Sequence, residues 1–214
     1  MPDIDATVAP AEQDHQTRSR LLCAAVDVFD RKGYAAASVR EIVELAGVAK
    51  PALYYHFGSK EALLTAVLEE AARAFARKMD AAMTRTGTAR ERLFALCADL
   101  HGLFQEHVPV VRVAHSVCFG PLEGTPKFDF TVFDRESERV VRRIVEDGQA
   151  TGEIAATASP SDIALMMTGI IGVFTTRQLH YGVATVDLAT LQRLVGLLFD
   201  GARGQQWQQG EPRS

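Results

Sequence analysis

The sequence predicts an all-α fold of about nine helices, and three observations support this prediction. Apolar residues recur at the spacing of one helical face, most regularly at Val39, Ile42, Val43 and Ala46. No segment shows the apolar–polar alternation of a half-buried strand. Glycines and capping residues divide the chain into periodic segments, whose boundaries carry an error of about 2–4 residues. The expected helices are 17–32, 38–46, 50–57, 60–85, 88–106, 109–118, 128–150, 160–181 and 187–203.

Several helix starts carry capping signals. Ser38 with Glu41, and Thr88 with Glu91, have the spacing of a capping box, in which each side chain accepts a hydrogen bond from the other residue's backbone. Asp187 is positioned to cap the last helix. We therefore expect well-defined helix starts at these three places.

Composition is that of a soluble globular protein. Of the 214 residues, 47% are hydrophobic and 23% are charged, which excludes wholesale disorder, a collagen-like fold and a disulfide-rich scaffold. The three cysteines form no C-x-x-C motif, and residues 1–16 lack the apolar centre of a signal peptide. The longest apolar stretch, residues 163–176, is shorter than the roughly 20 residues that span a membrane. We therefore expect a cytoplasmic protein with no membrane partner.

Charge is distributed unevenly along the chain. The net charge is -4, so the protein is not a uniformly basic nucleic-acid coat. Residues 1–16 carry four acidic residues and no basic one, whereas residues 17–60 carry seven Lys or Arg against four Asp or Glu. A small basic module on an acidic body is compatible with a local DNA-binding surface.

Residues 38–57 have the pattern of a helix, a glycine turn and a second short helix. Ala46 is small enough to let the second helix approach, and Gly47 can adopt a backbone conformation that a side chain would penalise. Val48 and Leu53 are apolar residues that would fill the angle between the helices. This arrangement is a helix-turn-helix motif, which inserts its second helix into the major groove of DNA.

Two pairs of side chains suggest a nucleic-acid surface. Lys50 and Lys60 stand at expected helix starts, where a cation opposes the helix dipole unless an anion such as phosphate lies nearby. Tyr54 and Tyr55 occupy successive helical positions about 100° apart, so at most one of them can be fully buried. A solvated lysine pair with a half-buried tyrosine is the alternative, but the combination at this spacing favours DNA.

Several short segments between residues 17 and 70 match one sequence pattern: AAVDVF (24–29), GY (33–34), SVREI (38–42), AGV (46–48), LYYHF (53–57), SKE (59–61) and LL (63–64). In this pattern the chain resembles the TetR family of bacterial transcriptional regulators. The resemblance implies an N-terminal three-helix DNA-binding domain followed by a helical domain for effector binding and dimerisation. The expected division is a disordered arm (1–16), a helix-turn-helix domain (17–62), an effector-binding and dimerisation domain (63–203) and a flexible tail (204–214).

The resemblance also implies roles for individual residues. Residues at the start of the first helix of the motif should contact phosphates, the first residues of the second helix should read base edges, and flanking residues should anchor the backbone. We include Tyr55 because at most one of the two neighbouring tyrosines can be fully buried. The expected DNA-binding residues are Ser38, Arg40, Lys50, Pro51, Ala52, Tyr54, Tyr55, His56 and Lys60.

Two positions depart from the family pattern. Ala49 replaces the common serine cap, which weakens the start of the second helix by about 1 kcal/mol. Ala52 occupies a position often held by threonine, serine or glycine, so fewer side-chain hydrogen bonds reach the bases, although its methyl group can touch a thymine methyl. Specificity would then depend more on Lys50 and on DNA shape.

The two last expected helices suggest a subunit interface. Residues 160–181 are apolar on nearly every face, and residues 187–203 over more than one stripe, so each helix should be buried on two sides. As the resemblance implies, these helices would form a four-helix interface in a homodimer; the alternative is the core of a monomer. The expected interface residues are Ile170, Val173, Leu191, Leu194 and Leu198.

An effector pocket is expected where bulky side chains and polar groups share mid-helix positions. The candidates are His101, Phe104, His115, Cys118, Phe119, Met166 and Phe174, for which an ordinary core is the alternative. Its ligand should be largely hydrophobic, because no cluster of charges projects from these helices. Two His/Cys pairs could supply four zinc ligands only in one particular helix register, so we expect no metal and no cofactor.

These patterns predict a transcriptional repressor that binds a palindromic double-stranded DNA operator as a homodimer and is released by an unknown small-molecule effector. Its half-sites should lie about 34–36 Å apart or in a wider related spacing. The common nucleophile, metalloprotease, phosphate-loop and dinucleotide motifs are missing, so we do not expect an enzyme. The alternative is a sequence-independent nucleoid protein without an effector, for which the C-terminal domain is larger than necessary.

Overall fold

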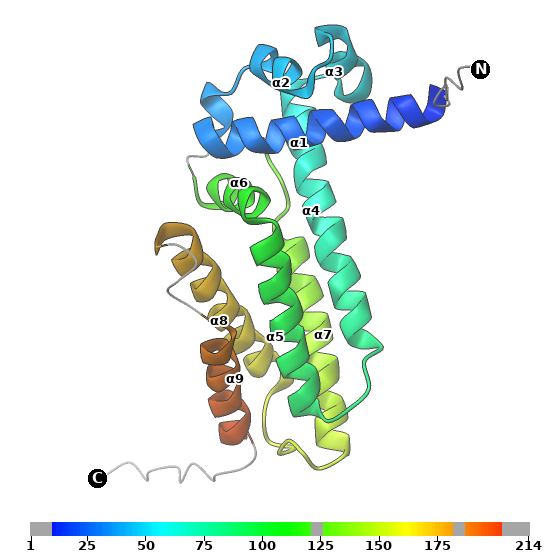
Figure 1. Cartoon of the computed structure of the whole chain (residues 1–214). Helices are drawn as coiled ribbons and strands as arrows, with labels where there is room; N and C mark the ends of the chain where they lie inside the picture. Colours follow the sequence, from blue (N-terminus) through cyan, green and yellow to red (C-terminus); the bar gives the residue numbers. More distant parts are fainter. Residues whose placement is uncertain (1–9, 121–125, 182–186, 203–214) are drawn as a thin grey trace, which may run out of the picture. The chain divides into compact units, whose positions relative to one another are not determined.

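The computed structural model describes residues 10–120, 126–181 and 187–202 (Figure 1). These residues form nine α-helices and no strand, which confirms the all-α prediction. The helices are α1 (Pro10–Ala36), α2 (Val39–Ala46), α3 (Lys50–Phe57), α4 (Lys60–Met83), α5 (Ala89–Glu106), α6 (Val108–Phe119), α7 (Thr131–Ala150), α8 (Pro160–Tyr181) and α9 (Leu188–Ala202).

The chain divides into two compact units. The N-terminal unit comprises residues 1–73 and 107–129, and thus contains α1, α2, α3, the start of α4 and α6. The C-terminal unit comprises residues 74–106 and 130–214, and contains the rest of α4 with α5, α7, α8 and α9. The roles assigned above to residues 17–62 and 63–203 remain predictions. The expected tail, 204–214, lies outside the described residues.

Helix α1 starts earlier than predicted, because residues 10–16 are helical where the sequence suggested a disordered arm. Ala11, Glu12 and Gln13 are strong helix formers, and they can extend a helix that packing has already nucleated further along the chain. Near its other end α1 breaks at Gly33, which has a left-handed backbone conformation (φ 74°, ψ 163°). Gly33 therefore marks the predicted end of the regular helix, and one more turn follows it.

The predicted capping signals are confirmed. The amide of Glu91 donates to Thr88 Oγ1 over 3.2 Å, and the amide of Thr88 donates to Glu91 Oε2 over 2.9 Å. The amide of Thr190 donates to Asp187 Oδ1 over 2.8 Å. Hydrogen bonds from the side chain and then from the backbone of Thr190 lower the pKa of the Asp187 carboxyl. Local sequence spacing therefore defined these helix starts without help from the tertiary structure.

The N-terminal unit is organised around α1. Buried side chains of α1, α2, α3 and α4 form its centre: Leu21, Ala25, Val28, Phe29, Ile42, Val43, Leu53, Leu63 and Leu64. Helix α6 packs on α1 and contributes Val113 and Val117 to the buried set. Arg112 of α6 donates to both carboxylate oxygens of Asp30 on α1, over 3.1 and 3.0 Å. Both hydrogen bonds come from the same nitrogen, Nη1, and they connect α6 to α1 at this point.

The C-terminal unit has its own core, formed by α5 and α7 with α8, α9 and the end of α4. Its fully buried side chains include Met79, Leu96, Ile144 and Met167. Burial raises the pKa of the Cys97 thiol in this core to about 12, so the group stays neutral and unreactive at physiological pH. The buried Arg92 pairs with Asp147 over 2.7 Å, which joins α5 to α7.

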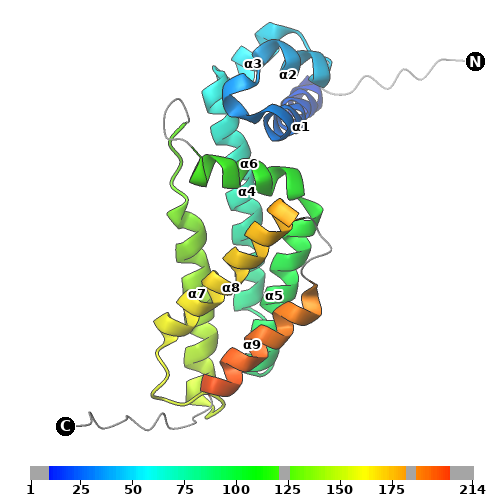
Figure 2. The same cartoon turned by 90° about the vertical axis from the view of Figure 1, so that its left-hand side faces the viewer.

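Helices α8 and α9 lie together on one side of the C-terminal unit, facing the viewer in Figure 2. Each has a buried side and an apolar exposed side. Large apolar side chains at least half exposed on these two helices are Leu165, Met166, Val173, Tyr181 and Leu197. This set, which we call the apolar outer face, is an unusual concentration of exposed apolar surface for a monomer.

Gly148 provides a test of the packing between α5 and α7. A Cβ atom at this position would lie 2.7 Å from the Cβ of Ala89 and 3.0 Å from Cδ1 of Ile154. We expect Gly148→Ala to lower the free energy of unfolding by about 1–3 kcal/mol through overpacking, measured by urea denaturation. Gly102→Ala is the matched control, since a Cβ there meets nothing within 4 Å; it should be neutral or slightly stabilising. An equal loss in both variants would contradict this account.

Candidate nucleic-acid interface

The turn between α2 and α3 has the geometry of a helix-turn-helix motif. Gly47 adopts the left-handed conformation (φ 62°, ψ 41°), and the amide of Val48 donates to the carbonyl of Val43 over 3.0 Å. Ala46 and Leu53 are buried on either side of the turn, as the sequence predicted. The apolar contacts and the left-handed turn together set the angle between the helices.

Arg20 of α1 holds this turn from outside the motif, and sequence reasoning missed it. Its guanidinium donates to the carbonyl of Gly47 over 3.0 Å, so it satisfies an acceptor that the end of α2 leaves open. A Cβ on residue 47 would lie 2.6 Å from Arg20 Nη2. Besides the left-handed backbone, this close contact is a second reason why the position requires glycine. No sequence signal links the two residues, because they are far apart along the chain.

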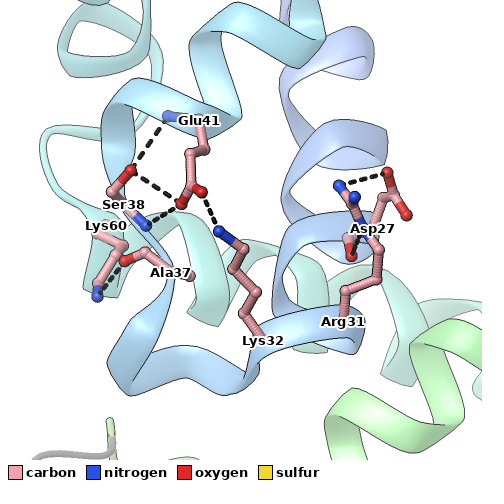
Figure 3. Close-up of polar contacts among 7 residues, drawn as sticks. All are labelled: Asp27, Arg31, Lys32, Ala37, Ser38, Glu41 and Lys60. Carbon is pink, nitrogen blue, oxygen red and sulfur yellow. Dashed lines mark hydrogen bonds and ion pairs between the residues drawn. The ribbon is translucent and has the colours of Figure 1, made fainter.

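The start of α2 is a complete capping box with an added cation (Figure 3). The amide of Glu41 donates to Ser38 Oγ over 3.2 Å, and the amide of Ser38 donates to Glu41 Oε2 over 3.2 Å. Lys32 forms an ion pair with the other carboxylate oxygen of Glu41. Hydrogen bonds from Lys32 and then from Ser38 lower the pKa of the Glu41 carboxyl. Ser38 is exposed at this helix start, where a phosphate would meet free backbone amides.

Lys60 at the start of α4 is engaged inside the N-terminal unit. Its ammonium donates to the carbonyl oxygens of Tyr34 and Ala37 over 2.9 and 2.8 Å, and it lies 4.4 Å from the centre of the Tyr34 ring. The contact to Ala37 is visible in Figure 3. The last carbonyl groups of a helix have no N–H partner within the helix, and the ammonium supplies these donors at the end of α1. A cation is also favourable there because the C-terminal end of the helix dipole is negative. Two of its three N–H groups are used in this way, which leaves one for a phosphate.

The first residues of α3 form an exposed surface. Lys50 and Pro51 are exposed, and Ala52 is half-buried. Ala49 provides no side-chain cap, as the sequence predicted. Tyr54 and Tyr55 are 45% and 78% exposed, so neither is buried, although burial of one was possible. The Lys50 ammonium lies 5.8 Å from the centre of the Tyr54 ring, and the two form one accessible patch.

The remaining two predicted DNA contacts differ in accessibility. The side chain of Arg40 is 84% exposed and donates to Glu44 over 2.7 Å, an ion pair that water screens. His56 has only 7% of its side chain exposed, and its Nε2 lies 3.7 Å from Asp14 Oδ1 on α1. His56 therefore faces α1, in part because α1 extends over residues that were expected to be disordered.

The predicted pocket residues are divided between the two units. His101 and Phe104 on α5 are half-buried in the C-terminal unit, and Phe174 on α8 packs against its core. Met166 is 54% exposed on the apolar outer face, so it is not in the interior. His115, Cys118 and Phe119 lie on α6 in the N-terminal unit, with the His115 and Phe119 ring centres 4.6 Å apart and Phe119 75% exposed.

One polar side chain in the C-terminal unit was not predicted. The Gln178 amide nitrogen on α8 is buried and has no hydrogen-bond partner among the described residues. A buried amide nitrogen without an acceptor costs free energy, so it is a candidate contact for a bound molecule. In the described ranges no group of His, Cys, Asp and Glu could hold a metal ion.

The predicted interface residues occupy different sides of α8 and α9. Val173 is 59% exposed on the apolar outer face, and Ile170, Leu194 and Leu198 are half-buried. Leu191 is only 3% exposed and belongs to the core of its own unit, so it offers no surface to a partner. Leu165 and Leu197 are 73% and 64% exposed, and they were not among the predicted interface residues. None of the helices in the described ranges has the length and hydropathy of a membrane span.

Known proteins share this fold and sequence pattern. A family model described as bacterial regulatory proteins of the tetR family matches residues 21–67. The transcriptional repressor NicS of Pseudomonas putida is 29% identical over 143 residues, which cover 66% of this chain and 68% of NicS. The transcriptional activator FasR of Mycolicibacterium smegmatis is 42% identical over 80 residues, 37% of this chain and 36% of FasR.

A solved structure extends the similarity to both units. FadR from Bacillus subtilis, in complex with stearoyl-CoA, matches with a TM-score of 0.69 and 23% identity, over 85% of this chain and 96% of FadR. The turn at Gly47 and the exposed start of α3 define a helix-turn-helix protein within an all-α regulator fold. Over residues 21–67 the chain is similar to the TetR family of bacterial transcriptional regulators.

The contacts of Lys60 generate a test that needs no DNA. We expect Lys60→Met to lower the free energy of unfolding by about 1.5–3 kcal/mol, because it removes charge-assisted hydrogen bonds to two partly buried carbonyl groups. Thermal or urea denaturation followed by circular dichroism measures this loss. Lys50→Met is the matched control on an exposed position, with an expected change within about 0.5 kcal/mol. Unchanged stability of Lys60→Met would show that the two carbonyl contacts are unimportant in solution.

Proposed function

We propose that this protein is a transcriptional repressor that binds a palindromic DNA operator as a homodimer in the bacterial cytoplasm and leaves it when a small, largely hydrophobic effector binds. The observation that carries the proposal is the exposed start of α3, where Lys50, Tyr54 and Tyr55 form one accessible patch beyond the turn at Gly47. A helix held in this way can enter the major groove and present its first side chains to base edges.

The DNA contacts follow from exposure and chemistry. Lys50, Pro51 and Ala52 read bases, with the Lys50 ammonium suited to guanine O6 and N7. Tyr54 and Tyr55 donate their hydroxyl groups to phosphates, and Ser38 and Arg40 bind phosphate at the start of α2. Lys60 and His56 contribute mainly by holding the domain together, and Lys60 keeps one N–H group for the backbone.

The effector site belongs in the C-terminal unit. We propose that His101, Phe104, Phe174 and Gln178 contact the ligand, and that the Gln178 amide donates to a carbonyl or carboxylate oxygen at one end of an apolar molecule. Stearoyl-CoA, which is bound in the FadR complex, is a ligand of this general kind in a protein of the same fold. Binding removes the protein from DNA only if the effector favours the conformation that does not bind the operator.

The apolar outer face provides the surface for homodimerisation. It combines exposed large side chains of α8 and α9, which a partner subunit would cover. A symmetric dimer presents two copies of α3 to two half-sites, so the operator is expected to be palindromic. No catalytic step is part of this proposal.

Selection of bound duplexes from a random DNA pool tests the function directly. We expect the purified protein, at near-physiological salt, to recover a palindrome whose half-site centres are about 34–36 Å apart or in a wider related spacing. Binding without any recovered motif would instead support a sequence-independent nucleoid protein. The recovered duplex then serves as a probe for ligands that release the protein.

Repeating the selection with Lys50→Ala tests base reading. The variant should lose preference at one base pair of each half-site, a change of about 1–3 kcal/mol in discrimination, while other positions keep theirs. Arg31→Ala is a control, since Arg31 is a basic residue of α1 paired with Asp27 and has no assigned DNA contact. If Lys50→Ala weakens binding to every sequence alike, Lys50 contacts phosphate and not bases.

A further inference from the structure

Nearly all basic side chains of the helix-turn-helix region have an acceptor within the N-terminal unit. Residues 17–60 carry seven Lys or Arg. Six of these form ion pairs or bind backbone carbonyl groups: Arg18, Arg20, Arg31, Lys32, Arg40 and Lys60. The exception is Lys50, which has no carboxylate or carbonyl partner in the part of the chain that the structure describes; its ammonium lies 5.8 Å from the centre of the Tyr54 ring. The region is rich in basic residues, yet few of its positive charges are free.

Two carboxylates of α2 take up donors that the proposed phosphate contacts need. Ser38 donates its backbone amide and its hydroxyl group to Glu41 Oε2, over 3.2 and 3.0 Å (Figure 3). Lys32 forms an ion pair with the same carboxyl group. Arg40 Nε donates to Glu44 Oε1 over 2.7 Å. A phosphate that approaches the start of α2 therefore meets donors and charges that already have an anionic partner.

The contact between Arg40 and Glu44 is open to solvent. The two residues lie one helical turn apart on the same side of α2, and both side chains are more than half exposed. A carboxylate and a phosphate are both anionic acceptors for a guanidinium, so they compete for Arg40. When Arg40 moves to a phosphate, Glu44 remains unpaired close to the DNA backbone, and like charges repel. The carboxylate therefore weakens the phosphate contact of its neighbour.

The same exchange reduces the dependence of binding on salt. A cation that neutralises a phosphate releases a counterion from DNA. A carboxylate that loses its basic partner attracts a cation from solution, which offsets part of this release. Lys50 has no such competitor, so contacts of α3 are not weakened in this way.

We propose that Glu44 attenuates the binding of this protein to DNA by competing with phosphate for Arg40. Glu41 acts in the same way on Ser38 and Lys32. The inference rests on the proposed function, because it takes the DNA backbone as the partner of α2. The attenuation is independent of base sequence, since every duplex presents the same phosphates.

Glu44→Gln tests the attenuation in the full-length protein, because it removes the carboxylate charge and leaves Arg40 in place. Fluorescence anisotropy measures binding to the operator recovered by selection and to a shuffled duplex of equal length, between about 50 and 200 mM KCl. We expect the variant to bind both duplexes about 2- to 5-fold more tightly per subunit, which corresponds to the strength of an exposed ion pair. The plot of log affinity against log salt should steepen by about 0.9 per subunit.

Asp27→Asn is the matched control. It removes the same charge and breaks an exposed i, i+4 ion pair of the same kind, between Asp27 and Arg31 on α1. Neither residue has an assigned DNA contact, so affinity for either duplex should change by less than about 2-fold. A double-mutant cycle with Arg40→Gln shows whether Glu44 acts through Arg40. In the Arg40→Gln background, Glu44→Gln should gain no more affinity than the control does.

Each other outcome has a distinct meaning, once circular dichroism verifies that all variants are helical. Unchanged binding of Glu44→Gln overturns the proposal, and weaker binding shows instead that Glu44 orients Arg40 toward the phosphate. A gain no larger than that of Asp27→Asn shows an effect of net charge alone and also overturns it. If the unchanged protein binds no duplex, the proposed function fails and this inference fails with it.

Discussion

The ammonium group of Lys60 is the point on which the geometry of the N-terminal unit depends. It binds the carbonyl group of Tyr34 in the last turn of α1 and that of Ala37 in the connection to α2, while belonging to the first turn of α4. Three helices thereby meet at one side chain, close to the capping box that starts α2 (Figure 3). The position of Ser38, the direction of α2 and, through the turn at Gly47, the direction of α3 all follow from this junction.

Short-range spacing explains what the sequence predicted well. Capping boxes, the left-handed glycine at 47 and the periodic burial of Ile42, Val43 and Ala46 are decided within a few residues of chain. The exposed surface of α3 follows from the same local pattern. For this reason the helix-turn-helix and most of its accessible residues could be identified from the amino-acid sequence alone.

Long-range contacts decide the features that the sequence could not reveal. Lys60 resembles a free phosphate-binding cation until the carbonyl groups of a distant turn are placed beside it. Leu191 and Leu197 are both leucines of one apolar helix, yet the rotation of α9 against α5 buries the first and exposes the second. His56 faces α1 because α1 extends beyond its apolar segment, which no periodicity signalled.

The chain passes between the two units three times, near residues 73, 106 and 129, because α6 returns to the N-terminal unit. The N-terminal unit is therefore not a contiguous segment of the gene. A truncation after residue 73 would remove Val113 and Val117 from its buried surface and would leave Asp30, whose side chain is only 13% exposed, without the guanidinium of Arg112. The N-terminal unit thus cannot be excised by a single cut, because α6, which belongs to it, follows the first segment of the C-terminal unit along the chain.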